Sequence, residues 1–316
     1  MATTYIVNIV VSKGLLFVKV EFIANNANKG ALMSATNYFF KNDEVIDGEY
    51  KVKSFFAIND YAQTYRVRNQ DFEAKVLKLF LQDATDELAV LARLDNPNVV
   101  KLDRVGDVAV NGQSYRYAIL DFVNGESLSE RVQRDEPLSF IGARNIFYGI
   151  INGLIYLRRL HPPVQHNRLL PKYVLLNLAS NTSAPVIANY SFSSGKNIHY
   201  LDDELYFVGA EAFTGDVLPS SDLYAAGAIY YYLLHGFPPF SNDLQTDIAF
   251  SEAIRQKKKM GVEFYEELYE STQYIIAKAL HPNPENRYQE PAEIRRDLYK
   301  DPHDPSFTEL LAALRD

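Results

Sequence analysis

The residue types that carry out chemistry are unevenly represented in this 316-residue chain. It has no cysteine, which excludes disulfides, thiol nucleophiles and cysteine-ligated zinc. None of the six histidines pair at the spacing of metal ligands, so no metal site is expected. The basic run Lys257, Lys258 and Lys259 is interpreted as a solvated helix end. Because the net charge is −8 and the other basic residues are scattered, nucleic acid is not expected as a partner.

The elements that could position a site follow from the hydrophobic pattern. Residues 5 to 23 are rich in Val, Ile and Phe around a break at 12 to 14, which predicts a hairpin. A β-rich block from Glu49 to Leu79, a helical period over 85 to 94 and a hairpin turn at Asn111-Gly112 follow. After Gly125, helices are predicted at residues 139–160, 222–234, 265–280 and 307–314. Strands with one helix, followed mostly by helices, predict an α+β protein in two lobes.

The N-terminal sequence shows no targeting signal. Residues 1 to 4 lack a basic region, and the apolar stretch after them is broken by Asn8, Ser12 and Lys13. No run of about 18 apolar residues is present, so no membrane span is expected in this chain. Together with the absence of cysteine, these features favour a cytoplasmic location.

A resemblance to a known family rests on an ordered set of motifs. They are Phe72–Lys78, Glu87–Leu91 with Asp95–Val100, Tyr117–Gly125, Ser221–Gly227 with Gly236–Phe240, and Pro284–Tyr288. In order and spacing they resemble the protein kinase superfamily, and within it the eukaryotic-like serine/threonine kinases. The resemblance implies a bilobal kinase-like fold, with a β-rich N-terminal extension at 1–48, an N-lobe at 49–123 and a C-lobe at 124–316.

The same resemblance assigns structural roles to residues that match the family. Leu91, His166 and Tyr190 are expected to stack as a spine that links the two lobes. Glu211 is expected to pair with Arg287. Asp222 is expected to cap the backbone of the loop that begins at His166.

The resemblance also implies a nucleotide site, in which some residues differ from those of the family. The glycine-rich loop falls at residues 57–65, which contain no glycine, so backbone amides cannot approach phosphate as closely. Lys75 stands for the phosphate-binding lysine and Glu87 for its partner, although the two could equally form a purely structural ion pair. Glu73 then falls where the family has a small residue against adenine; a register shift of one residue would place Ala74 differently.

The positions that carry phosphoryl transfer in the family are replaced. Arg168 stands where the catalytic aspartate belongs, and arginine cannot accept a proton at physiological pH. Tyr173 replaces the metal-binding asparagine, and Leu170 replaces a lysine that contacts phosphate. Asn189 replaces the metal-binding aspartate, in the segment Asn189-Tyr190-Ser191.

These replacements predict a pseudokinase, a kinase-like protein without phosphoryl transfer. It would act as a scaffold or allosteric regulator whose partner is another, unidentified protein, and it would need no cofactor. The alternatives are an atypical transferase on the same fold, a regulator that retains some nucleotide binding, or a structural subunit that docks through its N-terminal extension.

Overall fold

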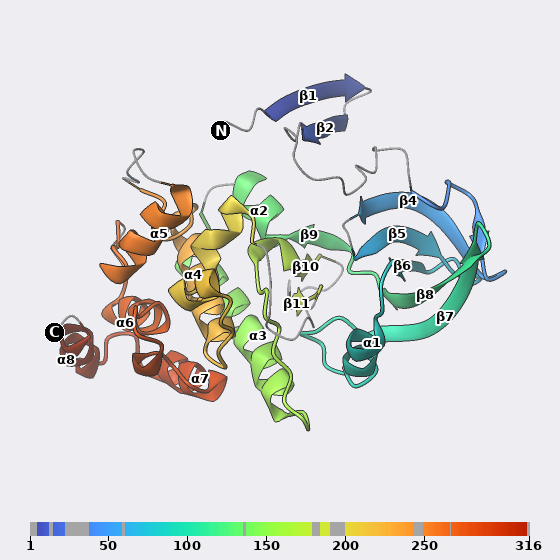
Figure 1. Cartoon of the computed structure of the whole chain (residues 1–316). Coiled ribbons are helices and arrows are strands. Elements are labelled where there is room, and N and C mark those ends of the chain that lie inside the picture. The colour runs from blue at the N-terminus through green and yellow to red at the C-terminus, as the bar shows by residue number, and fades with distance from the viewer. Residues whose placement is uncertain are drawn as a thin grey trace. The chain divides into compact units, whose positions relative to one another are not determined.

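The chain divides into two compact units, Met1–Phe39 and Phe40–Asp316. A computed structural model describes residues 5–12, 15–22, 38–58, 61–134, 137–178, 184–189, 200–242, 249–265 and 267–314 (Figure 1). The predicted boundary after residue 48 is too late, because β3 (Val45–Ile46) pairs with β4 (Tyr50–Ile58) in the larger unit.

The smaller unit contains the hairpin that the sequence predicts. Strand β1 (Tyr5–Ser12) and strand β2 (Leu15–Phe22) pair antiparallel, with Tyr5 opposite Phe22 and Ser12 opposite Leu15. They form a two-stranded sheet of their own.

The N-lobe of the larger unit is an antiparallel sheet of six strands in the order β3-β4-β5-β6-β8-β7. The further strands are β5 (Ala62–Arg68), β6 (Ala74–Phe80), β7 (Leu102–Val110) and β8 (Gln113–Asp121). Alternate residues of three strands are fully buried on one face: Tyr65, Val67, Leu77, Leu79, Tyr117 and Ile119. The turn between β7 and β8 is the predicted Asn111-Gly112, and both residues have the positive φ that such a turn requires.

One helix, α1 (Thr85–Leu91), follows β6 and belongs to the N-lobe. Its Leu88 and Leu91 are buried three residues apart, as the helical period predicts. Glu87 is also buried on α1, so this helix carries a carboxylate into the protein interior.

The C-lobe, from residue 124 onward, is mostly helical. Its small sheet, in the order β11-β10-β9, is made of β9 (Gly125–Ser127), β10 (Val174–Asn177) and β11 (Pro185–Ile187). Its α-helices are α2 (Leu128–Arg134), α3 (Phe140–Arg159), α4 (Ser221–His235), α5 (Phe250–Lys259), α6 (Glu270–Ala279), α7 (Pro291–Tyr299) and α8 (Ser306–Ala313). Short 3-10 helices are η1 (Pro171–Tyr173), η2 (Asp202–Phe207), η3 (Ala210–Thr214) and η4 (Pro284–Asn286).

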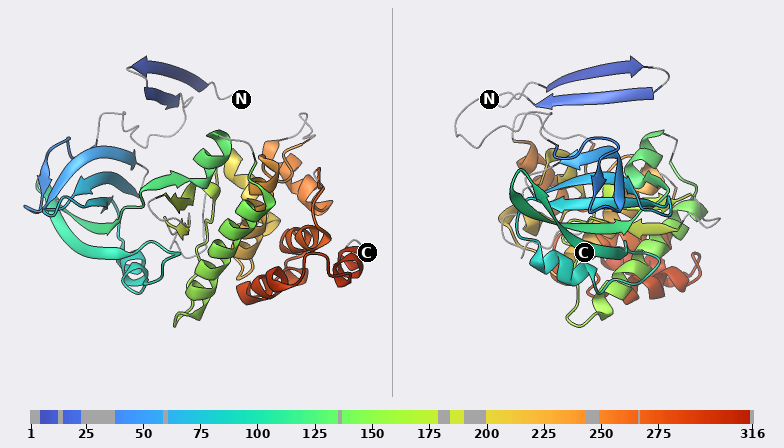
Figure 2. Two further views of the ribbon diagram at one scale, coloured as in Figure 1. Left: turned by 180° about the vertical axis from the view of Figure 1, so that it is seen from behind. Right: turned by 90° about the vertical axis from the view of Figure 1, so that its right-hand side faces the viewer.

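In the rear view of Figure 2, the larger sheet and the helices coloured yellow to red stand at opposite ends of the larger unit. The two-lobed α+β fold predicted from the sequence is therefore confirmed.

Helix α4 forms the centre of the C-lobe core. All of its residues except the first are buried, and its Tyr230 ring stacks on Phe147 of α3 with the centroids 4.2 Å apart. Within the described residues, α3 is long and apolar enough to cross a membrane. That is weak evidence for a span, because ten of its twenty residues are buried in the core and a core helix passes the same test.

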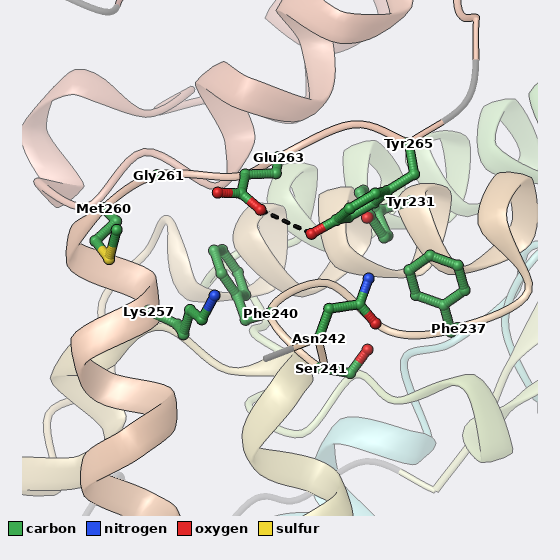
Figure 3. Close-up of a pocket in the computed structure, with 10 residues that line it drawn as sticks. All are labelled: Tyr231, Phe237, Phe240, Ser241, Asn242, Lys257, Met260, Gly261, Glu263 and Tyr265. Carbon is green, nitrogen blue, oxygen red and sulfur yellow. Dashed lines mark hydrogen bonds between the residues drawn. The ribbon is translucent and has the colours of Figure 1, made fainter. Parts of the chain in front are cut away.

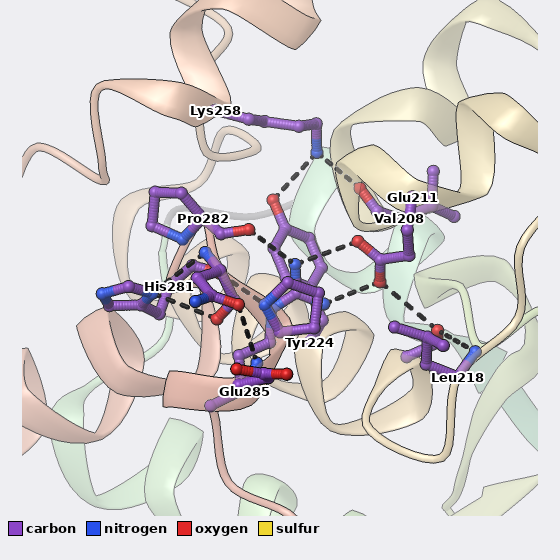
Figure 4. Close-up of polar contacts among 12 residues, drawn as sticks. Val208, Glu211, Leu218, Tyr224, Lys258, His281, Pro282 and Glu285 are labelled. Carbon is purple, nitrogen blue, oxygen red and sulfur yellow. Dashed lines mark hydrogen bonds and ion pairs between the residues drawn. The ribbon is translucent and has the colours of Figure 1, made fainter.

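A buried ion pair joins two segments of the C-lobe that are 76 residues apart (Figure 4). Arg287 donates to both carboxylate oxygens of Glu211, at 2.7 and 3.0 Å, and its side chain is fully buried. Arg287 also donates to the backbone carbonyl of His281 at 2.8 Å. Although burial alone would raise the pKa of Glu211, the hydrogen bond from Arg287 lowers it. The predicted Glu211–Arg287 pair is thus present.

Lys258 lies beside this pair and is 2% exposed. Its ammonium donates to the carbonyl of Val208 at 2.6 Å and to the hydroxyl of Tyr224 at 2.9 Å (Figure 4). Burial lowers the pKa of Lys258 well below its usual value. The interpretation of all three lysines as a solvated helix end is therefore wrong for Lys258, because it follows the buried Ile254 by one helical turn.

Replacing Arg287 should be costly. Arg287→Met leaves the Glu211 carboxylate, whose side chain is 10% exposed, without its cation, which should lower the free energy of unfolding by roughly 3–5 kcal/mol. Arg116→Met is the control, because its pair with Asp107 is exposed and should contribute roughly 0–1 kcal/mol. Urea unfolding of the three proteins measures the difference, and equal losses in the two variants would contradict the assignment.

Candidate functional site

A cleft of about 560 Å³ lies between the two lobes. This volume is within the range of small-molecule sites. Its N-lobe wall comes from β4, β5, β6, α1 and β8, and its C-lobe wall from β9, α2, η1, β10 and the residues after β11. The apolar part of the lining includes Val76, Leu91, Val100, Leu120, Val123 and Leu175.

A second pocket, beside α5, is much smaller. It holds about 20 Å³, and ten residues between Tyr231 and Tyr265 line it (Figure 3). The Tyr265 hydroxyl donates to Glu263 across its rim at 2.7 Å. A space of this size admits about one water molecule, so it is not a ligand site.

The lysine that faces the cleft is Lys78. Its ammonium lies 2.6 Å from the Glu87 carboxylate, and both side chains are at most 10% exposed. The ion pair links β6 to α1, and both residues line the cleft. The predicted partner of Glu87, Lys75, is therefore wrong: the lysine that pairs with Glu87 is Lys78.

Lys75 points to the opposite face of β6, because it lies three positions before Lys78 and side chains alternate along a strand. It pairs instead with Asp121 at 2.9 Å and with Asp103 at 3.3 Å. Although burial works in the other direction, the hydrogen bond to Asp121 raises the pKa of Lys75.

This register also moves the residue that faces adenine in the family. Two positions before Lys78 stands Val76, an apolar residue that lines the cleft. Glu73 is exposed and lies in the turn before β6, where its side chain accepts a hydrogen bond from Asn69 at 2.9 Å. The expected placement of Glu73 at the adenine-facing position is therefore wrong.

The turn that corresponds to the glycine-rich loop joins β4 to β5. Its residues 59 and 60 lie outside the described part of the chain. The sequence contains no glycine between Gly48 and Gly106, so this turn offers phosphate no glycine backbone.

Asp222 of α4 anchors the loop that begins at His166. This carboxylate accepts hydrogen bonds from the backbone amides of His166 at 2.7 Å and Asn167 at 3.0 Å, as the sequence predicts. The His166 ring is fully buried, and its Nε2 lies 2.9 Å from the Ala188 carbonyl. Burial lowers the pKa of His166, so the ring is neutral at pH 7.

Arg168 is held in an ion cluster on the same loop. Its Nη2 lies 2.7 Å from one oxygen of Glu204, and Lys172 Nζ lies 2.6 Å from the other oxygen. Glu204, in η2, is 1% exposed. The position of the family's proton acceptor is thus occupied by a cation whose charge is used to fix η2 on the loop.

Tyr173 and Asn189 both line the cleft at the positions where the family holds metal. Neither supplies a carboxylate, which magnesium prefers. The described residues contain no group of three or more His, Cys, Asp or Glu that could hold a metal ion. The residues present therefore do not fit a magnesium site.

The predicted spine is only partly described. Leu91 is buried and lines the cleft, and His166 is buried in the C-lobe loop. Tyr190 lies outside the described residues, so the stacking of all three stays a prediction.

The two lysines of β6 should differ in their contribution to stability. Lys78→Met leaves Glu87 as a buried carboxylate without a cation and should cost roughly 3–5 kcal/mol of unfolding free energy. Lys75→Met should cost about 1 kcal/mol or less, because Asp103 and Asp121 are each more than 40% exposed. A larger loss for Lys75→Met than for Lys78→Met in urea unfolding would refute the placement of Lys78, rather than Lys75, beside Glu87.

His166 should make stability depend on pH. The unfolded chain protonates this ring below pH 6.5, whereas the folded protein keeps it neutral to lower pH, so unfolding takes up a proton. Stability should fall as the pH drops from about 7 to 5.5, by up to about 1.4 kcal/mol per pH unit. His166→Gln should reduce this slope in urea unfolding; an unchanged slope would show that His166 does not titrate differently in the two states.

Comparison with known proteins agrees with this geometry. The family profile described as "Protein kinase domain" matches residues 64–299. The chain is 25% identical over 215 residues to a protein named serine/threonine-protein kinase PknB from Mycobacterium leprae, covering 66% of this chain and 34% of that protein. It is 24% identical over 247 residues to the DNA damage response protein kinase DUN1 of Saccharomyces cerevisiae, covering 71% of this chain and 48% of that protein.

The chain therefore spans between a third and a half of the length of these relatives. The family profile covers well over half of this chain, from β5 of the N-lobe to the end of α7 in the C-lobe. The protein belongs to the protein kinase domain family.

Proposed function

We propose that this chain is a pseudokinase, which has the kinase fold but does not transfer phosphate. The observation that carries the proposal is Arg168, which stands at the position of the proton acceptor and is bound to Glu204. An arginine stays protonated at physiological pH and cannot activate a hydroxyl group.

Two further replacements remove the means of holding metal. Phosphoryl transfer depends on metal ions that neutralise charge on the phosphates. Tyr173 has a phenol and Asn189 a neutral amide where the family has its metal ligands, and the cleft offers no group of acids in their place within the described residues. The three losses together favour a chain without catalysis.

We further propose that its function is to bind another protein, as a scaffold or allosteric regulator in the cytoplasm. The support is the contrast between what is kept and what is lost. The contacts that hold the fold are kept, among them Glu211–Arg287, Asp222 beneath the loop and Lys78–Glu87. The names of the relatives describe active kinases, so partner binding without catalysis is a property proposed for this chain alone.

A second candidate function is nucleotide binding without metal. It is favoured by the Lys78–Glu87 pair, which faces a cleft with an apolar wall formed by Val76, Leu120 and Leu175. The missing glycines and metal ligands weaken the phosphate end of such a site.

Phosphate transfer can be measured directly. The purified chain is incubated with γ-labelled ATP, magnesium or manganese, and generic protein substrates, next to its Lys78→Met variant and an active kinase. Incorporation should equal that of Lys78→Met, because the proton acceptor and metal ligands are missing. Transfer by the wild type that Lys78→Met abolishes would overturn the pseudokinase proposal.

The same preparations separate the second candidate from the first. A rise in melting temperature with ATP that does not require magnesium would support metal-free binding, because a ligand of the native state must stabilise it. A rise that requires magnesium would contradict the conclusion that the cleft does not fit the metal.

A further inference from the structure

The mouth of the cleft is shaped by a β-bulge in β4. Ser54 pairs with Arg66 and Phe55 with Tyr65, but the next paired residue is Ala57, opposite Thr64, so Phe56 is an extra residue. In a regular strand, two consecutive residues point to opposite faces. Here Phe56 and Ala57 both line the cleft, because the bulge turns Phe56 onto that face.

Phe56 packs against an aromatic residue of the segment that joins the lobes. The rings of Phe56 and Phe122 are stacked, with centroids 6.4 Å apart and planes inclined by 26°. The guanidinium carbon of Arg66 lies 4.6 Å from the centroid of Phe122. Arg66, Phe122 and Phe56 thus form a cation–aromatic cluster at the mouth of the cleft.

The charge of Arg66 has no counterpart in the described part of the chain. Among these residues Arg66 forms no ion pair, and its Nε is buried without a hydrogen-bond partner. A buried donor without a partner is costly, so a site of this kind calls for an acceptor.

The other charged side chains of the lining are matched within the protein. Lys78 pairs with Glu87, and Asp121 pairs with Lys75. Glu126 pairs with Arg134, and the Glu130 carboxylate accepts hydrogen bonds from the backbone and hydroxyl of Ser127. Arg66 is therefore the cation of the described lining that a ligand could neutralise.

Arg66 stands at the end of the cleft where the family places the neutral adenine ring. It pairs across the sheet with Val76, the residue at the adenine-facing position, whereas Lys78 lies two pairs further along β6, opposite Thr64. A nucleotide directs its phosphates toward the lysine. A ligand whose anionic group binds Arg66 therefore places its charge at the adenine end of the cleft, opposite to the end where a nucleotide places its phosphates.

We propose that the cleft binds a small organic anion. Its carboxylate or phosphate is bound by the guanidinium of Arg66, and its apolar body lies against Val76, Leu120 and Leu175. The planar fork of arginine suits both oxyanions, because it can donate two parallel hydrogen bonds. The inference stands whether or not the chain transfers phosphate.

The test uses three probes of the same shape: 2-naphthoate, 2-naphthyl phosphate and the neutral 2-naphthamide. Calorimetry and thermal melting of the full chain should show binding of at least one anion, about tenfold or more tighter than the amide, because the amide keeps one acceptor oxygen but lacks the negative charge and the second acceptor oxygen. The tighter of the two anions identifies carboxylate or phosphate as the preferred group.

Variants assign the effect to Arg66. Arg66→Gln should bind the anions no better than the amide, and Arg66→Lys, which keeps the charge but not the fork, should bind them at an intermediate level. Arg116→Gln is the matched control: it makes the same change of charge on β8 of the same sheet, its side chain is half exposed, and it does not line the cleft. Its binding should equal that of the wild type.

Three results would each overturn the proposal. They are the absence of binding by both anions up to their solubility, equal binding of anion and amide, and anion binding that Arg66→Gln and Arg66→Lys leave unchanged. None of these readouts depends on labelled ATP, so they are separate from a failure of the pseudokinase proposal.

Discussion

The fold depends on the rule that a carboxylate removed from water needs a cation or hydrogen-bond donors beside it. Three glutamates obey it, and each joins two parts of the larger unit. Glu87 ties α1 to β6 through Lys78, Glu204 ties η2 to the loop through Arg168 and Lys172, and Glu211 ties η3 to the segment after η4 through Arg287. Both residues of the first pair line the cleft, so this pair fixes part of its N-lobe wall.

The second of these clusters gives a structural role to the position that holds the catalytic aspartate in the family. Arg168 does not leave a gap in the loop but gives Glu204 a partner that an aspartate could not provide. Asp222 continues to hold the backbone beneath it through two amides. The loop is thus well anchored with an arginine at this position.

Much of the fold and part of the site could be predicted from the sequence. The hairpin turn at Asn111-Gly112 and the core helices α3 and α4 follow from local signals: turn residues and helical period. Arg168 could be assigned because the loop motif around it is contiguous in sequence.

Prediction from the sequence fails where neighbours distant in the chain decide the outcome. Both Lys75 and Lys78 lie in one strand, so choosing between them needs the position of Glu87 in space. Of helix α5 the sequence predicts only the end at the lysine run, and Lys258 is expected in solvent because lysine is rarely buried. The bulge that turns Phe56 into the cleft leaves no mark in the pattern, since all three residues from Phe55 to Ala57 are apolar.

The burial of Lys258 also changes what the run of three lysines presents to its surroundings. An enzyme that acylates or methylates lysine must enclose the whole side chain; Lys259 is exposed and Lys257 is half-buried, whereas Lys258 is buried. The middle amine is held by carbonyl oxygens and a tyrosine inside the C-lobe. To a modifying enzyme, this tribasic sequence therefore offers two separate lysines on either side of an unreactive one.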